Sequence, residues 1–246
     1  MKDIKIKILN ECDIYNIEKM TVKTAMLTQH GHEISDMDSF DEFFDKPYSQ
    51  ETLEKLCRLP HPTIRKFGVI HIVIVGASRS FLEHITRHQN EVKFMSASLH
   101  YSKYDRAEYV IPLSLRNKSE ELAIYKKSCE EAIANYKALA DKGYSVQAGN
   151  IMPRAMRNTL IISATPFQWV HMCQQRSCCR NTEETRYIMY TIACMLKERS
   201  PALFWDVFPE CTRTKCPEGK MCCGKVFEED SNKMTMDILD WRCRSE

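Results

Sequence analysis

The stretch from Val69 to Tyr104 constrains the fold of this chain more than any other. Residues 66–75 read KFGVIHIVIV, and Gly76 is expected to end the segment. Its alternate side chains would form two apolar faces, one of Val69, Val73 and Val75 and one of Ile70, Ile72 and Ile74. β-Branched residues on both faces are typical of a strand that is covered on both sides. The sequence therefore predicts a central strand in the interior of a sheet.

A helix is expected directly after this strand. Ser78 is a suitable N-cap, and the helix is predicted to run to about His88, where it ends in the polar triplet Arg87-His88-Gln89. Cations are common in the last turn of a helix because the helix dipole favours them there. The triplet therefore has two open interpretations, a solvated helix end or part of a binding site.

A second polar cluster, Arg176 to Arg186, lies much further along the chain. A buried strand is predicted over Asn158 to Ala164. Pro166 is expected to open the helix that follows, since its missing N–H is harmless in a first turn, and Thr182 to open the next one. We hypothesise that the two polar clusters meet in the folded chain.

The first cluster resembles the signature of flavin-dependent thymidylate synthases, which has the form R-H-R-x-x-S-x-N-E-x-S-x-R-Y. The pair Arg87-His88, Ser98 and Tyr101 fit this form, with one extra residue between its two halves. Three residues depart from it, in place of Arg, Glu and Arg: Gln89, Ser96 and His100.

The second cluster is similar to a later pattern of the same family, T-x-N-x-R-x-x-x-H-F-x-x-x-R-x-x-x-x-A-Q-x-E-I-R. Four residues fall in register with it: His171, Arg176, Glu184 and Arg186. Thr165 and Phe167 replace its Asn and first Arg. Upstream, His61-Pro62-Thr63 resembles the family's H-x-S/T. The resemblance covers about residues 60–200.

The resemblance implies an enzyme that makes thymidylate from deoxyuridylate (dUMP), with FAD as cofactor, NADPH as reductant and methylenetetrahydrofolate as the folate carbon donor. Hydride would pass from the reduced flavin to the pyrimidine, so a protein nucleophile is not expected. Arg176 is the expected catalytic residue, because a permanently charged guanidinium can stabilise negative charge that gathers on the pyrimidine.

The remaining roles are also carried over from the resemblance. The residues expected to bind FAD are Thr63, Arg87, His88, Gln89, His171 and Arg180. The residues expected to bind the nucleotide are His84, Ser96, Ser98, His100, Arg176 and Arg186. The active sites are expected to be shared among the subunits of a homotetramer.

Two departures bear on the substrate. Gly149 stands where the family has an Arg that binds the nucleotide phosphate, and His100 replaces another Arg. Together they are expected to remove two charge-assisted hydrogen bonds of about 1.5–3 kcal/mol each. Three interpretations stay open: the same reaction in a rearranged pocket, a different pyrimidine nucleotide or one-carbon step, or a flavin or nucleotide binder without catalysis.

Composition narrows the class of protein. The chain is 43% hydrophobic and 28% charged, as in ordinary soluble proteins, and its net charge of +2 gives no reason to expect nucleic acid or a membrane as partner. The first residues lack the apolar core of a signal peptide. We therefore expect a cytoplasmic protein.

The C-terminal part has a different composition. Four of the twelve cysteines crowd together there, namely Cys211, Cys216, Cys222 and Cys223. Their spacing lacks the C-x2-C knuckles of common zinc sites, so both a zinc site and surface thiols are considered and no metal ligand is assigned. A non-enzymatic, Cys-rich metal-binding or interaction protein is a further alternative.

The predicted elements indicate an α+β fold, with a mixed or antiparallel sheet flanked by helices. Besides the central stretch we expect a strand over Lys2–Leu9, a helix over Ile14–Gln29 with Asp13 as N-cap, and a long helix over Ser119–Ala140. Residues 1–200 are predicted to form the synthase-like domain and 201–246 a Cys-rich extension, with a short helix over Met234–Trp241.

Overall fold

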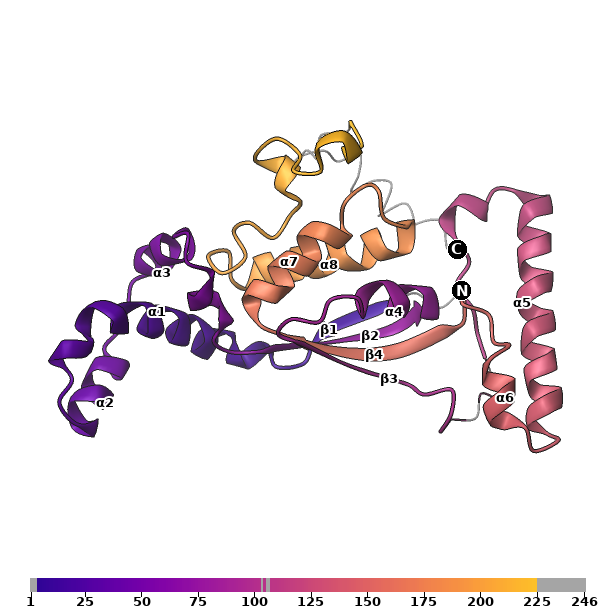
Figure 1. The fold of residues 1–246 in the computed structure, drawn as a ribbon, viewed down its shortest axis with the longest axis horizontal. Coiled ribbons are helices and arrows are strands. Elements are labelled where there is room, and N and C mark those ends of the chain that lie inside the picture. Colours follow the sequence, from indigo (N-terminus) through magenta and orange to yellow (C-terminus); the bar gives the residue numbers. More distant parts are fainter. Residues whose placement is uncertain (1–3, 103, 105–106, 225–246) are drawn as a thin grey trace.

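The fold is built on a four-stranded antiparallel sheet of strand order β1-β2-β4-β3, seen in a computed structural model that describes residues 4–102, 104 and 107–224 (Figure 1). The strands are β1 (Lys5–Ile8), β2 (Ile70–Ser78), β3 (Val92–Ser96) and β4 (Arg157–Ala164). Helices pack against this sheet, so the predicted α+β class is confirmed, and of the two sheet types considered, mixed or antiparallel, the antiparallel one is found.

The central strand β2 is buried on one face only. Ile70, Ile72 and Ile74 are fully buried, whereas Val75 on the other face is 42% exposed. Its neighbours on that open face include Ile161 of β4, which is 38% exposed. The prediction of a strand covered on both sides is therefore wrong for the single chain, because all the covering helices lie on one side.

Gly76 does not end β2, as the sequence had suggested, but bends it. The strand continues to Ser78 with a register shift between Val75 and Ala77, and Gly76 has φ +90°. This is a β-bulge at a backbone conformation that glycine adopts without strain. A Cβ here would also lie 2.0 Å from a terminal nitrogen of Arg157, which crosses over the glycine.

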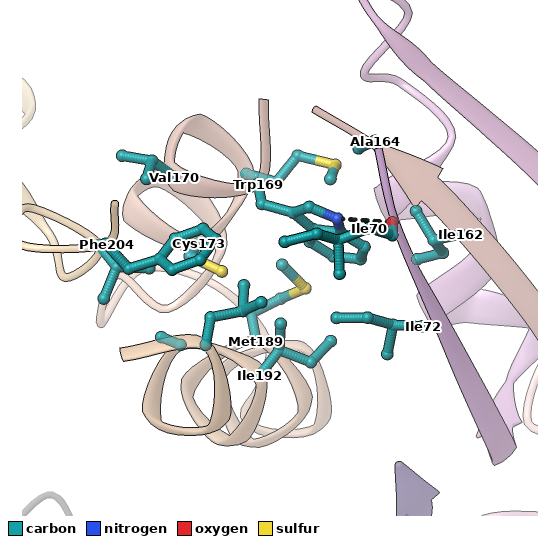
Figure 2. Packing of buried hydrophobic residues seen from close by; sticks show 14 of the residues in the cluster. Ile70, Ile72, Ile162, Ala164, Trp169, Val170, Cys173, Met189, Ile192 and Phe204 are labelled. Atoms are coloured by element: carbon teal, nitrogen blue, oxygen red, sulfur yellow. Dashed lines mark hydrogen bonds between the residues drawn. The ribbon is translucent and has the colours of Figure 1, made fainter. Parts of the chain in front are cut away.

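Three helices cover the buried face of the sheet: α4 (Arg79–Ile85), α7 (Pro166–Arg176) and α8 (Glu183–Arg199). Trp169 of α7 is fully buried, and its indole N–H donates to the carbonyl of Ile70 at 3.0 Å (Figure 2). The predicted cap Ser78 accepts from the Phe81 N–H, and Thr182 caps α8 in the same way. Helix α4 ends at Ile85, a little before the predicted end.

The N-terminal helices form an arm beside the sheet: α1 (Ile14–His30), α2 (Met37–Asp45) and α3 (Gln50–Cys57) (Figure 1). The expected cap Asp13 makes no side-chain capping bond, because a short 3-10 helix leads directly into α1. The 3-10 helices are Glu11–Asp13, Gly31–Glu33, Pro62–Lys66 (η3), Leu113–Leu115, Glu210–Thr212 and Gly219–Met221.

Helices α5 (Ser119–Ala140) and α6 (Ser145–Gly149) pack together at the other end of the molecule (Figure 1). They enclose a small second core with the chain before and after them, including Ile133, Tyr136 and Met156. The predicted extended piece around Tyr109 forms an isolated bridge to Met156. No helix among the described residues is long and apolar enough to cross a bilayer.

The start of the C-terminal part packs into the main core. Phe204 is fully buried, and Asp206 forms an ion pair with the buried Arg65 at 2.6 Å. The Trp205 indole donates to the Cys57 carbonyl. The division of the chain at residue 200 stays a prediction, and the helix expected over Met234–Trp241 lies outside the described residues.

Candidate functional site

The ends of α4 and α7 bring the two polar clusters together. Nε of Arg176, at the end of α7, donates to Nε2 of His88 at 2.9 Å. The His88 and His171 rings meet edge to face, with centroids 5.6 Å apart. His88 is buried, while Arg176 and His171 are partly exposed. The hypothesis that the clusters meet is confirmed.

His88 is held neutral in this arrangement. Burial, followed by the charge of Arg176, lowers the pKa of His88 to about 4. Since Nε2 accepts the bond from Arg176, the proton of the neutral ring must sit on Nδ1. Burial also lowers the pKa of His171 and of His84. The three imidazoles therefore offer hydrogen bonds without adding charge at neutral pH.

Two guanidinium groups lie close together at this site. Burial, and then the nearby charge of Arg87, lower the pKa of Arg176. Arg87 itself is exposed at the turn after α4. Two cations held near each other repel, and a bound anion would relieve that repulsion. The electrostatics of the site therefore favour a ligand that carries negative charge.

The start of α8 fixes α4 from the opposite end. Glu184 accepts from the backbone N–H of Ser78 at 2.6 Å and from the Ser78 hydroxyl at 2.5 Å. Burial raises the pKa of Glu184, and the two bonds from Ser78 oppose that rise. One turn before Arg87, His84 approaches the hydroxyl of Thr185 at 3.4 Å. The register match of Glu184 thus corresponds to a partly buried link between two helices.

Two further arginines belong to the second polar cluster. Arg180 lies between α7 and α8, and Arg186 lies in the first turn of α8. Arg180 donates to the backbone carbonyl of Met221 in the C-terminal part. Arg186 approaches the sulfur of Cys179 at 3.9 Å, and its Nε is buried with no partner in the part of the chain that the structure describes. An unsatisfied buried donor is costly, so an acceptor on a ligand would stabilise this position.

A cavity of about 490 Å³ opens beside the cluster. His171, Arg176 and Arg180 line one side of it. The other side comes from the Cys-rich segment, with Glu210, Cys211, Cys216 and Glu218 among its residues. Sequence reasoning missed this wall, because no local signal links the end of α7 to a segment that follows α8.

The donors around this cavity fit a flavin nucleotide. Arginine N–H groups match phosphate and carbonyl oxygens, and a neutral histidine can bond to a ring edge. Outside the lining of this cavity, the buried Nε of Arg186 is a further donor with no acceptor among the described residues. Among the described residues, by contrast, no three His, Cys, Asp or Glu side chains are arranged to hold a metal ion.

Three candidate nucleotide ligands, at the end of β3 and in the segment after it, lie away from the arginine–histidine cluster. Ser96 ends β3, and the Ser98 hydroxyl accepts from the backbone N–H groups of His100 and Tyr101. The carbonyl of Ser98 accepts from the Tyr104 hydroxyl, beside the small core of α5 and α6. Within one chain these residues join the α5–α6 end of the molecule rather than the arginine–histidine cluster.

Two candidate flavin ligands are exposed. Thr63 lies in η3, which packs against α7, and Gln89 lies in the turn that follows α4. At the position of the missing phosphate ligand, Gly149 is buried against Leu99. A Cβ there would lie 3.3 Å from the Leu99 Cβ, which leaves little space for a larger side chain.

The fold is shared with solved nucleotide enzymes. A UMP/dUMP methylase, PolB from Streptomyces cacaoi bound with 5-Br dUMP, gives a TM-score of 0.65 at 14% identity, over 84% of this chain and 95% of that one. Thymidylate synthase X from Helicobacter pylori with FAD and dUMP gives 0.61 at 15% identity, over 83% and 99%. At these identities the likeness defines the class of fold.

Sequence comparison then defines the family. The profile of the thymidylate synthase complementing proteins matches residues 13–202. The flavin-dependent thymidylate synthase of Geobacter sulfurreducens is 26% identical over 179 residues, which cover 72% of this chain and 77% of that protein. The chain therefore belongs to the flavin-dependent thymidylate synthase family and is an enzyme. This overturns the alternative of a non-enzymatic, Cys-rich binding protein.

Proposed function

We propose that the enzyme methylates dUMP to thymidylate, with FAD as cofactor and with methylenetetrahydrofolate and NADPH as co-substrates. The observation that carries this proposal is the meeting of Arg176 with Arg87 and the neutral His88, beside a cavity that Arg176 lines. A flavin nucleotide and a pyrimidine nucleotide both bring phosphates and ring carbonyls. Such groups are bound well by guanidinium donors.

Arg176 is the proposed catalytic residue. Its Nε is used by His88, which leaves the two terminal nitrogens to bond a carbonyl or ring edge of the pyrimidine. A guanidinium held in this way stabilises negative charge on the ring without a change of its own position. Arg186 and His84 are proposed to bind the same nucleotide.

The FAD ligands are proposed to be Thr63, Arg87, His88, Gln89, His171 and Arg180. Bound FAD would supply the hydride chemistry. The protein's part is to orient the nucleotide and to exclude water from it. For His88 the available donor is Nδ1–H, because Nε2 already accepts from Arg176.

The nucleotide site is proposed to be completed by a second chain in a homotetramer. Ser96, Ser98 and His100 lie apart from the cluster within one chain, so they would reach a cluster only across a subunit boundary. The open face of the sheet supports assembly, since Val75 and Ile161 are apolar residues that a second chain would cover. No nucleic acid or membrane is proposed as partner, and the proposed location is the cytoplasm.

A second candidate substrate is UMP, or another pyrimidine nucleotide. The observation in its favour is Gly149, which stands packed against Leu99 in place of the family's phosphate-binding Arg. A pocket that has lost this ligand must hold the nucleotide by other contacts, and those contacts can change which sugar is accepted.

The test begins with purified protein mixed with FAD and desalted. We expect a retained flavin absorbance band that shifts on titration with dUMP, and tritium release from 5-tritiated dUMP when both co-substrates are present. A shift with UMP and none with dUMP would select the second candidate. Retained flavin that responds to neither would refute both, and the absence of any retained flavin would refute the assignment to FAD.

A further inference from the structure

Four thiols gather in the segment that walls the cavity beside Arg180. Cys216 and Cys222 lie within hydrogen-bonding reach of each other, Cys223 adjoins Cys222 in the same way, and Cys211 is close enough to influence Cys216 electrostatically. This segment follows residue 202, where the match to the family profile ends. The profile therefore does not cover the cluster.

Cys222 has the environment of a reactive thiol. Its side chain is exposed, and the backbone N–H of Gly224 donates to its sulfur at 3.4 Å. That bond, aided by the neighbouring thiol and by the positive charge of Arg180, lowers the pKa of Cys222. Low-pKa thiols at exposed, electropositive positions react preferentially with disulfides.

Cys216 has the environment of a resolving partner. It is partly buried on the wall of the cavity. A backbone hydrogen bond from Glu218 lowers the pKa of Cys216, but burial and the neighbouring thiols Cys222 and Cys211 together raise it. The exposed Cys222 is therefore the expected first nucleophile, and Cys216 is the thiol that closes the disulfide. The two residues are separated by a short turn that includes the 3-10 helix Gly219–Met221, so a disulfide between them would close only a short loop.

The turn between the two thiols also contacts the candidate flavin site. The carbonyl of Met221, directly before Cys222, accepts the hydrogen bond from Arg180. Arg180 lines the same cavity as Cys216, together with His171 and Arg176. A bond that fixes this turn would therefore fix a wall of the cavity as well.

We propose that Cys216 and Cys222 are a reversible dithiol–disulfide pair whose oxidation locks the Cys-rich wall against Arg180. With oxidised glutathione as oxidant, the Cys222 thiolate attacks one glutathione sulfur and releases one glutathione thiolate. Cys216 then attacks the Cys222 sulfur, loses its proton and releases the second glutathione. Two protein thiols become one disulfide, and one glutathione disulfide becomes two thiols.

The linkage can be located by peptide mapping. Trypsin cuts after Lys215, Lys220 and Lys225, so Cys216 lies in the peptide CPEGK and Cys222 in MCCGK. The full-length protein is equilibrated with reduced and oxidised glutathione, alkylated and digested without reductant. We expect the two peptides to be joined in the oxidised sample and separate in the reduced one.

Matched variants identify the partners. Cys223→Ser should keep the linked peptides, and Cys222→Ser should lose them. Cys12→Ser is the control, because Cys12 is an exposed thiol near the start of the chain, far in sequence from Cys216 and Cys222. A bond inside MCCGK between Cys222 and Cys223, or linked peptides that persist in Cys222→Ser, would overturn the proposal. Separate peptides under all glutathione ratios would overturn it as well.

The effect on the cavity rests on the proposed function and is measured separately. The oxidised wild type should release FAD several-fold more slowly than the reduced form, and Cys222→Ser should release it at the reduced rate in both buffers. If the oxidised and reduced wild type release FAD at equal rates although the linked peptides are present, the proposed effect of the disulfide on the cavity is refuted. A protein that binds no FAD but shows the linked peptides would refute the proposed function and leave the pair established.

Discussion

The hydrogen bond between Arg176 and His88 makes two residues from distant segments act as one unit. Without this bond the Arg176 side chain could adopt several rotamers, and the hydrogen bond to His88 stabilises one of them. Because His88 remains neutral, it orients the guanidinium without neutralising it. The positive charge of Arg176 therefore stays available for a ligand.

Arg176→Ala should reduce turnover by about 10²-fold or more, while the fold and most FAD binding remain. The physical reason is the loss of the fixed charge proposed to face the pyrimidine. Tritium release and the retained flavin absorbance measure the two effects. Arg213→Ala, in an exposed position of the C-terminal part, is the control. Full turnover by Arg176→Ala would remove this residue from the catalytic role.

His88→Gln tests the neutral imidazole through the pH dependence of stability. The folded chain keeps His88 unprotonated down to about pH 4, whereas the unfolded chain protonates it near pH 6.5. The unfolded state thus binds more protons in this window, so wild-type stability falls as pH drops through it. Glutamine can accept the Arg176 bond but does not titrate.

Between pH 7 and pH 4.5 we expect wild type to lose about 2 kcal/mol more unfolding free energy than His88→Gln. Urea unfolding at several pH values measures this difference. His88→Leu, which cannot accept from Arg176, should weaken nucleotide binding where His88→Gln retains it. Parallel pH curves for wild type and His88→Gln would contradict the neutral, buried histidine.

At the scale of elements, the path of β2 depends on one glycine. Gly76 makes the bulge that carries the chain from the strand to the Ser78 cap of α4. The same Ser78 receives Glu184 from α8, so the bulge, the cap and the helix start form one connected structure. A distortion of β2 at this point would displace α4 and the cluster at its other end.

Gly76→Ala should destabilise the fold by about 2–4 kcal/mol, because it adds a Cβ both at φ +90° and against the Arg157 guanidinium. Gly143→Ala is the matched control. Gly143 also has φ +90°, but a Cβ there meets nothing within 4 Å, so only the backbone strain of about 1 kcal/mol applies. Urea unfolding compares them, and equal losses would contradict the close approach of Arg157.

At the scale of the whole molecule, one face of the sheet carries its helices and the other is open. Val75, Ile161 and Met95 are exposed on that open face, with Met95 at 73%. Solitary apolar residues on a surface are common, but a row of them across adjacent strands is typical of an interface. The separation of Ser98 and His100 from the arginine cluster agrees with such an assembly.

Replacing both Val75 and Ile161 by Lys should dissociate the proposed tetramer and remove activity, because charges would be buried between chains. Light scattering after size exclusion measures the mass, and the tritium assay the activity. Ile124→Lys is the control, since Ile124 is 68% exposed on α5. A double variant that keeps the wild-type mass would place the interface elsewhere.

Local signals in the sequence were enough for much of the fold. Ser119–Ala140 was predicted to the residue because an amphipathic run of residues defines that helix locally. Ser78 was predicted as a cap, and Thr182 as the residue that opens the next helix, for the same reason. Asp13 failed as a cap because the turn before α1 decides where its side chain points.

The sequence by itself predicted most of the helices and strands, the α+β class with a mixed or antiparallel sheet and, through two motifs, that the two polar clusters meet. The tertiary structure alone decided that Nε of Arg176 bonds His88, that Gly76 bends β2 beneath Arg157, and that cysteines wall the cavity. Helix periodicity and capping depend on neighbours in sequence. These three features depend on side chains that meet only after the sheet and helices have packed, and no local pattern encodes such a meeting.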